Sequence, residues 1–142
     1  MGGINVPRWI GGGVVAALVI YVIEAVMAIN VWAGPATARL TELGLNTQMT
    51  RGSYLAYAIV CLLVGLVLIF FYAAARTRLG PGVRTAVIVS VALFIGGYLP
   101  GFIDYHVIGL YPDDLLVKWT FQGVIEYIIA GIAGAWVYRE GA

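Results

Sequence analysis

Four long stretches of apolar, almost uncharged residues restrict the fold of this 142-residue chain more than any other feature. A helix needs about 20 mainly apolar residues to cross the hydrocarbon core of a bilayer, and each stretch reaches that length. Backbone groups in lipid must be satisfied within the chain, which only helical bundles and closed barrels achieve. No stretch alternates with a period of two, so a barrel is excluded. The sequence predicts transmembrane helices at about 9–32, 53–75, 83–103 and 115–138.

The connections between these stretches carry no domain of their own. Hydrophobic residues make up 62% of the chain and charged residues 11%, against about 25% charged in soluble domains. The longest connection, 33–52, contains "PATARLTELG", which could form a short helix lying in the membrane interface. We predict an all-α integral membrane four-helix bundle that forms a single transmembrane domain over 1–142.

The basic residues predict the orientation of this bundle. With four spans, both termini and the middle connection lie on one side of the membrane. That side holds five of the eight Lys and Arg residues: Arg8, Arg76, Arg78, Arg84 and Arg139. Because cytoplasmic connections carry the excess of positive charge, we expect both termini to be cytoplasmic, an N-in/C-in arrangement.

The first stretch has a second interpretation, as a cleaved signal peptide. It has a basic start, and "VWA" resembles a cleavage site with small residues. The apolar part of a signal peptide is about 7–15 residues long, however, and this stretch is longer and interrupted by Glu24. A retained first helix is therefore the favoured interpretation.

Two glutamates stand inside the predicted spans at matching depths. Glu24 lies eight residues before Trp32, and Glu126 lies seven residues after Trp119. At a rise of about 1.5 Å per residue, both lie on the order of 10–12 Å below the outer interface. Gln122 is one helical turn from Glu126 and shares its face. We expect the three residues to form an intramembrane polar site in which at least one glutamate is protonated or paired.

One face of each predicted helix is small or polar, which suits close contact between helices in lipid. On the third helix this face contains Ser90, Phe94, Gly97, Gly101 and Asp104. On the first it contains Gly13, Ala17, Ile20 and Glu24. We expect these faces to point into the bundle. We also expect Trp9, Trp32, Trp119 and Trp136, at the ends of the spans, to form aromatic belts in the interfaces.

The sequence "GGYLPGFIDYH" predicts a break in the third helix at Pro100 and Gly101, because proline cannot donate the backbone hydrogen bond and its ring clashes with the preceding turn. A break at this depth favours a vestibule that opens to the outside. Its rim would hold Asp104, Tyr105, His106, Asp113 and Asp114.

These rim residues have alternative roles. Asp113 and Asp114 follow Pro112, so they also suit the start of a helix, where acids are favourable. Asp104, His106 and Glu126 are weak candidates for a metal site, because carboxylates and imidazole are common ligands. Loop histidines at interfaces are common, so we predict no metal and no cofactor.

Catalysis and nucleic-acid binding find no support in the residue pattern. The sequence has no nucleophile–base pair, zinc-binding helix motif or phosphate loop, and the single cysteine, Cys61, allows no intramolecular disulfide. The basic connection "ARTRLGPGVRT" has a tight-turn composition and lacks a phosphate-binding lysine pattern. We therefore expect a protein that is not an enzyme and binds no nucleic acid.

Three segments carry a resemblance to known proteins. "YAAARTRLGPGVRTA", "AGAWVYRE" and "INVPRWIGGG" resemble parts of small uncharacterised bacterial four-helix membrane proteins, and the resemblance extends over the whole chain. It implies a multi-pass protein of the bacterial cytoplasmic (inner) membrane. That group has no established activity, so the resemblance implies no site residues.

Two classes of function stay open. In the first, the chain is a non-catalytic integral membrane component, either a homo-oligomer or an accessory subunit of a larger membrane complex; its partners are then the lipid bilayer and further copies or other subunits. In the second, it is a small transporter or channel, coupled to protons or cations through the glutamate pair. Short connections and abundant small residues favour the first class, which we expect. The matched depth of the two acids and the predicted helix break favour the second.

Overall fold

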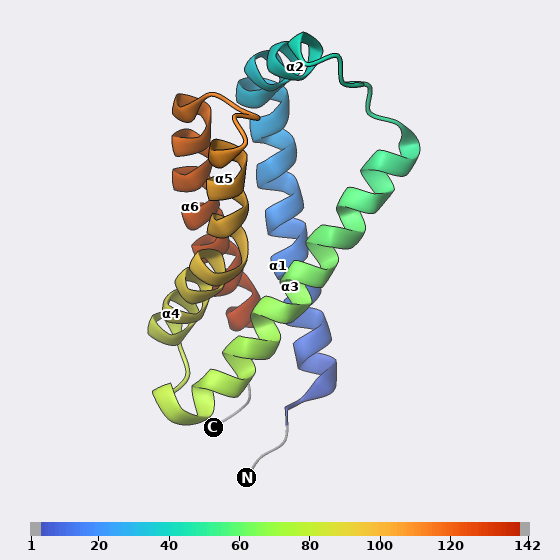
Figure 1. Cartoon of the computed structure of the whole chain (residues 1–142). Coiled ribbons are helices and arrows are strands. Elements are labelled where there is room, and N and C mark those ends of the chain that lie inside the picture. Colours follow the sequence, from blue (N-terminus) through green and yellow to red (C-terminus); the bar gives the residue numbers. More distant parts are fainter. Residues whose placement is uncertain (1–3, 140–142) are drawn as a thin grey trace.

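The structure is a computed structural model that describes residues 4–139, and these residues form helices and short connections without any strand. Within these described residues, four helical runs are long and apolar enough to cross a membrane, as the sequence predicts: Val6–Glu42, Arg51–Leu79, Val83–Val107 and Asp113–Val137. They pack into one all-helical bundle (Figure 1).

Two of the four runs contain a short π-helical segment. The first run consists of α1 (Val6–Met27), the π-helix η1 (Ala28–Trp32) and α2 (Ala33–Glu42). The second and fourth are the uninterrupted helices α3 (Arg51–Leu79) and α6 (Asp113–Val137). The third consists of α4 (Val83–Leu93), the π-helix η2 (Phe94–Tyr98) and α5 (Leu99–Val107).

The starts of α1 and α3 follow local sequence signals. The side chain of Asn5 accepts a hydrogen bond from the backbone of Arg8, and a proline stands in the first turn of α1. Before α3, Thr50 and Ser53 form a capping box in which each side chain satisfies the backbone N–H of the other. These caps satisfy donors that the first turn of a helix leaves unpaired.

Glycines bring α1 into close contact with its two main neighbours. A Cβ atom on Gly12 would lie 2.6 Å from the carbonyl oxygen of Gly134 on α6. A Cβ atom on Gly65 of α3 would lie 2.6 Å from the backbone nitrogen of Ala17. Any side chain at these positions would overlap backbone, so the small-residue faces set the spacing between the helices.

The start of α1 and the end of α6 meet at one end of the bundle, here named the terminal end (Figure 1). The backbone N–H of Asn5 donates to the hydroxyl of Tyr138 at 3.1 Å. The guanidinium of Arg8 donates to the carbonyl oxygen of Arg139. The connection between α3 and α4 lies at this end too.

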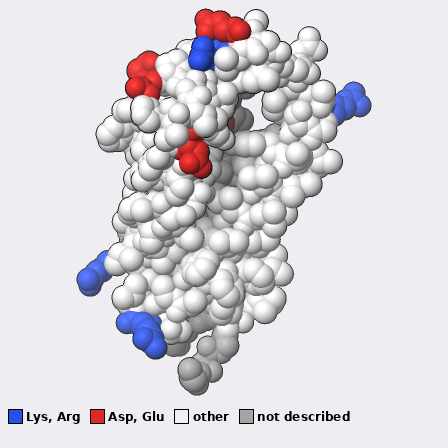
Figure 2. Space-filling view, in the orientation of Figure 1, with Lys and Arg blue, Asp and Glu red and all other residues white. Residues whose placement is uncertain are grey.

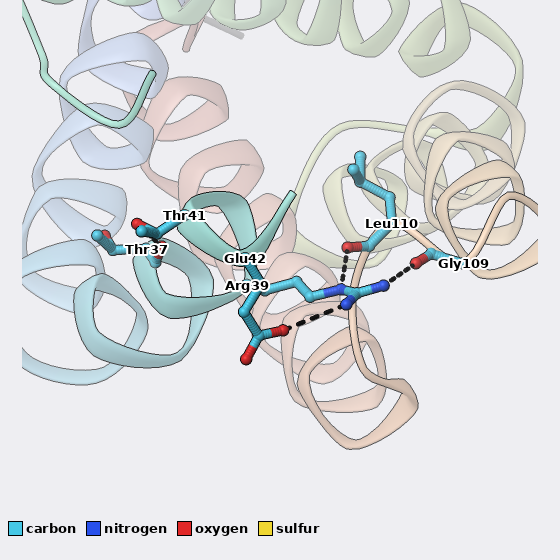
Figure 3. A network of polar contacts seen from close by, with 6 residues as sticks. All are labelled: Thr37, Arg39, Thr41, Glu42, Gly109 and Leu110. Carbon is cyan, nitrogen blue, oxygen red and sulfur yellow. Dashed lines mark hydrogen bonds and ion pairs between the residues drawn. The ribbon is translucent and has the colours of Figure 1, made fainter. Parts of the chain in front are cut away.

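The opposite, distal end holds α2 and the turn between α5 and α6, and Arg39 joins them (Figure 3). Its Nε and Nη2 atoms donate to the carbonyl oxygens of Leu110 at 3.2 Å and of Gly109 at 2.9 Å. Its Nη1 atom pairs with Glu42 at 3.2 Å. The short helix that follows the first span is therefore fixed over the α5–α6 turn.

Charged side chains gather at the two ends of the molecule and leave an uncharged band between them (Figure 2). Large apolar side chains are exposed in this band, among them Leu18, Val22 and Ile125. A band of this kind is the surface that a bilayer would cover.

Candidate functional site

The predicted helix break at Pro100 and Gly101 is wrong, because the π-helix η2 lets the helix continue past them. The chain does not unwind there. The backbone N–H of Leu99 bonds to the carbonyl of Phe94, five residues earlier, and Pro100 stands in the first turn of α5. The π-helical turn restarts the helix just before the proline, where a missing N–H costs least, so the helix continues to Val107.

The π-helical turn also changes which residues face the bundle. It adds one residue, so every later position moves by one relative to a regular α-helix. Gly97 and Asp104, predicted to face inward, are exposed. The ring of Tyr98 instead packs 5.6 Å from that of Tyr127 on α6, and the ring of Phe102 packs 6.2 Å from that of Trp119.

Glu24, Glu126 and Gln122 meet inside the distal half of the bundle. The Glu24 carboxyl lies beside the Glu126 carboxyl and the Tyr57 hydroxyl of α3. The Gln122 Nε2 atom donates to Glu126 Oε2 at 3.3 Å. Glu126 is 2% exposed, so this carboxyl has no access to bulk water.

Trp32 completes the hydrogen bonding of the amide. Its indole N–H donates to Gln122 Oε1 at 2.6 Å, which fixes the orientation of the amide and directs its N–H₂ group toward Glu126. The Trp32 side chain is 6% exposed. Its expected place in an aromatic belt is therefore wrong, because the indole turns inward to this partner.

No cation balances the two carboxyls within residues 4–139. The titratable groups around them are Tyr57 and Cys61 on α3, Tyr98 on η2 and Tyr127 on α6, and no Lys or Arg is among them. A proton on one carboxyl would let it donate a hydrogen bond to the other, and two uncompensated charges so close together would be costly to bury. The pair can thus hold one proton and at most one negative charge.

A cavity of about 220 Å³ lies against this pair. Glu24 and Gln122 form its polar wall, whereas Glu126 lies behind them. The remaining lining residues are aromatic: Tyr57, Tyr98, Phe102, Tyr105, Tyr111 and Trp119. The surface is hollowed in the distal half of the molecule (Figure 2).

Burial raises the pKa of Tyr111, and the neighbouring Tyr105 raises it further, so this phenol is neutral at physiological pH.

The residues predicted for the outer vestibule are only partly brought to the cavity. Tyr105 lines it, whereas Asp104 is exposed on another face of α5. The His106 Nδ1 atom lies 2.7 Å from Asp113 Oδ1, and Lys118 donates to Asp114 at 3.2 Å. Both pairs are on the exposed surface of the distal end.

The weak metal candidates Asp104, His106 and Glu126 are not gathered into a site. His106 is paired with Asp113, and Glu126 is buried in the bundle. In the part of the chain that the structure describes, no group of three or more His, Cys, Asp or Glu side chains is placed to hold a metal ion.

Sequence reasoning missed most of the aromatic lining. A signal was present, because Phe94, Tyr98, Phe102 and Tyr105 follow one another at spacings of four, four and three residues. The glycines beside them matched the expected small face of a transmembrane helix equally well. Tyr111 lies in a connection, where helical spacing gives no information.

Comparison with protein-family models, with curated proteins and with solved structures finds no match for this chain. The resemblance to small bacterial four-helix membrane proteins therefore stays a prediction.

Proposed function

We propose that this chain is a small multi-pass membrane transporter or channel that binds protons or cations at the Glu24–Glu126 pair. The proposal takes the second of the two classes that the sequence left open. One observation carries it: two carboxyls from different helices lie side by side next to a cavity, with no Lys or Arg among the described residues around them.

The cost of a charge in the membrane supports a functional role. Ionisable side chains inside spans are expensive, and they mark ion and proton pathways by default. Helix packing alone would need only a neutral group such as the Gln122 amide. With one shared proton, the pair retains a negative charge that a second proton or a cation entering the cavity would neutralise.

The membrane orientation is part of the proposal. The terminal end carries five basic residues and would face the cytoplasm, so the cavity would open toward the outer side. A bacterial cytoplasmic membrane is the proposed location. Labelling of an introduced cysteine tests the orientation: in a Cys61→Ser background, Leu45→Cys should react with an impermeant maleimide added to whole spheroplasts. Reaction only after the membrane is broken would reverse the orientation.

Flux through liposomes tests the function itself. The purified chain would be reconstituted with a pH-sensitive dye inside, and gradients of protons and of a weakly basic organic ammonium ion would be imposed. We expect flux in the wild type and none in the doubly substituted Glu24→Gln, Glu126→Gln protein, with Glu42→Gln as the exposed acidic control. Equal flux in the double variant, or no flux in the wild type, would contradict the proposal.

A second candidate, a component of a membrane assembly, is favoured by one observation on η2 and α5. Gly96, Gly97 and Gly101 have no atom within 4 Å of where a Cβ atom would stand, whereas the glycines of α1 and α6 pack against neighbouring helices. A second chain could occupy this small-residue face. Native mass spectrometry after gentle extraction tests it, because a subunit should appear with copies or partners, and a monomer alone would contradict it.

A further inference from the structure

We infer that the cavity beside Glu24 binds a small organic ammonium ion, held by the carboxylate at one wall and by aromatic ring faces around it. This inference rests on the proposed function, since it names the class of cation that the glutamate pair would take. The composition of the lining, the arrangement of the rings and the size of the cavity all favour such an ion.

The lining suits an organic cation better than a metal ion. Hard metal cations such as Ca²⁺ are held by about six to eight oxygen ligands. This cavity offers the Glu24 carboxyl, the Gln122 amide and a few phenol groups, and six of its eight lining residues are aromatic. An ammonium group with alkyl substituents needs no shell of oxygen ligands, because the faces of aromatic rings attract it.

Five of the six lining rings form a continuous chain of contacts along the cavity. Tyr98 and Phe102 lie 5.2 Å apart by their centroids, and Phe102 stacks at 6.2 Å on Trp119. Trp119 meets Tyr111 at 4.9 Å, and Tyr111 meets Tyr105 at 5.7 Å. Each ring contacts the next, so the wall is already formed without a ligand, and a preformed site lowers the entropic cost of binding.

The charge and the volume of the cavity restrict the choice of ligand further. Since no Lys or Arg is among the described groups around Glu24, a bound cation would meet an uncompensated carboxylate. The volume of about 220 Å³ is below the usual range for drug-sized ligands, about 300–1,000 Å³. A compact ion such as tetramethylammonium fits these limits, whereas large lipophilic cations do not.

Binding of radiolabelled tetramethylammonium to the purified protein in detergent is the test. We expect saturable binding that tert-butyl alcohol, a neutral molecule of similar shape, does not displace. Glu24→Gln should abolish binding. Tyr98→Leu and Trp119→Leu should each weaken it on the order of tenfold, since a desolvated cation–π contact is strong, whereas Tyr98→Phe keeps the ring and most of the affinity. Trp136→Leu is the control, because that indole is 64% exposed on the band facing lipid near the terminal end.

The outcomes separate this inference from the proposed function. No saturable binding, or equal binding by the wild type and the Tyr98→Leu and Trp119→Leu proteins, would overturn the inference, even if proton flux still required both glutamates. Binding with the expected ring dependence but without any flux would support the inference and contradict the proposed transport. If the two leucine variants do not fold, Tyr111→Leu in the α5–α6 connection removes a ring from the wall without altering a helix.

Discussion

The terminal and distal halves of this bundle differ in which contacts bring their helices together. In the terminal half, α1 meets α3 and α6 through glycines, and no side chain separates the backbones at Gly12, Gly65 and Gly134. In the distal half, the contacts are made by aromatic rings, two carboxyls and an amide, and a cavity is left among them. In the distal half, bulky rings stand between the helices, whereas in the terminal half the glycines let the helix backbones touch.

The difference separates close helix packing from the polar cavity within one small bundle. Dispersion contacts and close backbone approach stabilise helix pairs in lipid without any polar group. A terminal half packed in this way leaves the distal half free to carry groups that are expensive to bury. Substitutions in the two halves should therefore have different consequences.

Adding a methyl group at Gly65 should give the largest loss of stability. The new Cβ atom would lie 2.6 Å from the backbone nitrogen of Ala17 and 2.9 Å from its Cα atom, so α1 and α3 must move apart. We expect Gly65→Ala to lower the free energy of unfolding by about 1–3 kcal/mol, measured by denaturant titration in detergent micelles. Gly101→Ala is the matched control, since nothing lies within 4 Å of its new atom. Equal stability of the two variants would break the distinction between the halves.

The amide bridge between Trp32 and Gln122 should contribute less than the glycine contacts. A double-mutant cycle with Trp32→Phe and Gln122→Ala measures the coupling between the two side chains, whose atoms are 2.6 Å apart. Hydrogen bonds between membrane helices contribute about 0.6 kcal/mol on average and at most about 1.7 kcal/mol. We expect a coupling within that range in the free energy of unfolding. Additive effects of the two substitutions would mean that the bridge is not formed.

Removing the Arg39 side chain should loosen α2 and leave the bundle intact. Its bonds to Leu110, Gly109 and Glu42 lie at the surface of the distal end, where such contacts contribute about 0–1 kcal/mol. We expect Arg39→Ala to speed amide hydrogen exchange in α2, with little change in α1 or α6. The control is Arg51→Ala, an exposed arginine at the start of α3. Faster exchange throughout the molecule would show that the contact has a larger role.

Replacing Ser90 by alanine should have the smallest effect, with a sign opposite to the others. Among the described side chains, the Ser90 hydroxyl is the buried polar group without a hydrogen-bond partner. It packs where a side chain on Gly131 would stand. Because an unsatisfied hydroxyl is costly to bury, we expect Ser90→Ala to leave the free energy of unfolding unchanged or to raise it by about 1 kcal/mol. A clear loss of stability would show that the hydroxyl has a hydrogen-bond partner in the folded protein.

The sequence predicted the four spans because the thickness of the bilayer sets how many apolar residues a helix needs to cross it. It also placed Glu24 and Glu126 at one level, since helical rise converts residue counts into depth. The inward face of α5 was predicted one residue out of place. Regular α-helical spacing cannot foresee a π-helical turn, and η2 moved Tyr98 and Phe102 to the positions expected for glycines.

The inward turn of Trp32 was missed for a different reason. An indole at the end of a span suits an interface and a buried hydrogen bond equally well, and only the neighbouring helix decides between them. Here Gln122 supplies the acceptor, and η1 precedes α2 at that point. Long-range partners of this kind follow from tertiary packing, which the spacing along one helix does not contain.

Infrared spectroscopy of the protein in lipid tests the central claim, that Glu24 and Glu126 hold a proton between them, most directly. The wild type should show the carbonyl band of a protonated carboxyl at neutral pH, and the doubly substituted Glu24→Gln, Glu126→Gln protein should lack it. Either single substitution should move the band of the remaining acid, because each carboxyl loses its partner. A wild-type spectrum without this band, or a band that persists in the double variant, would contradict the account.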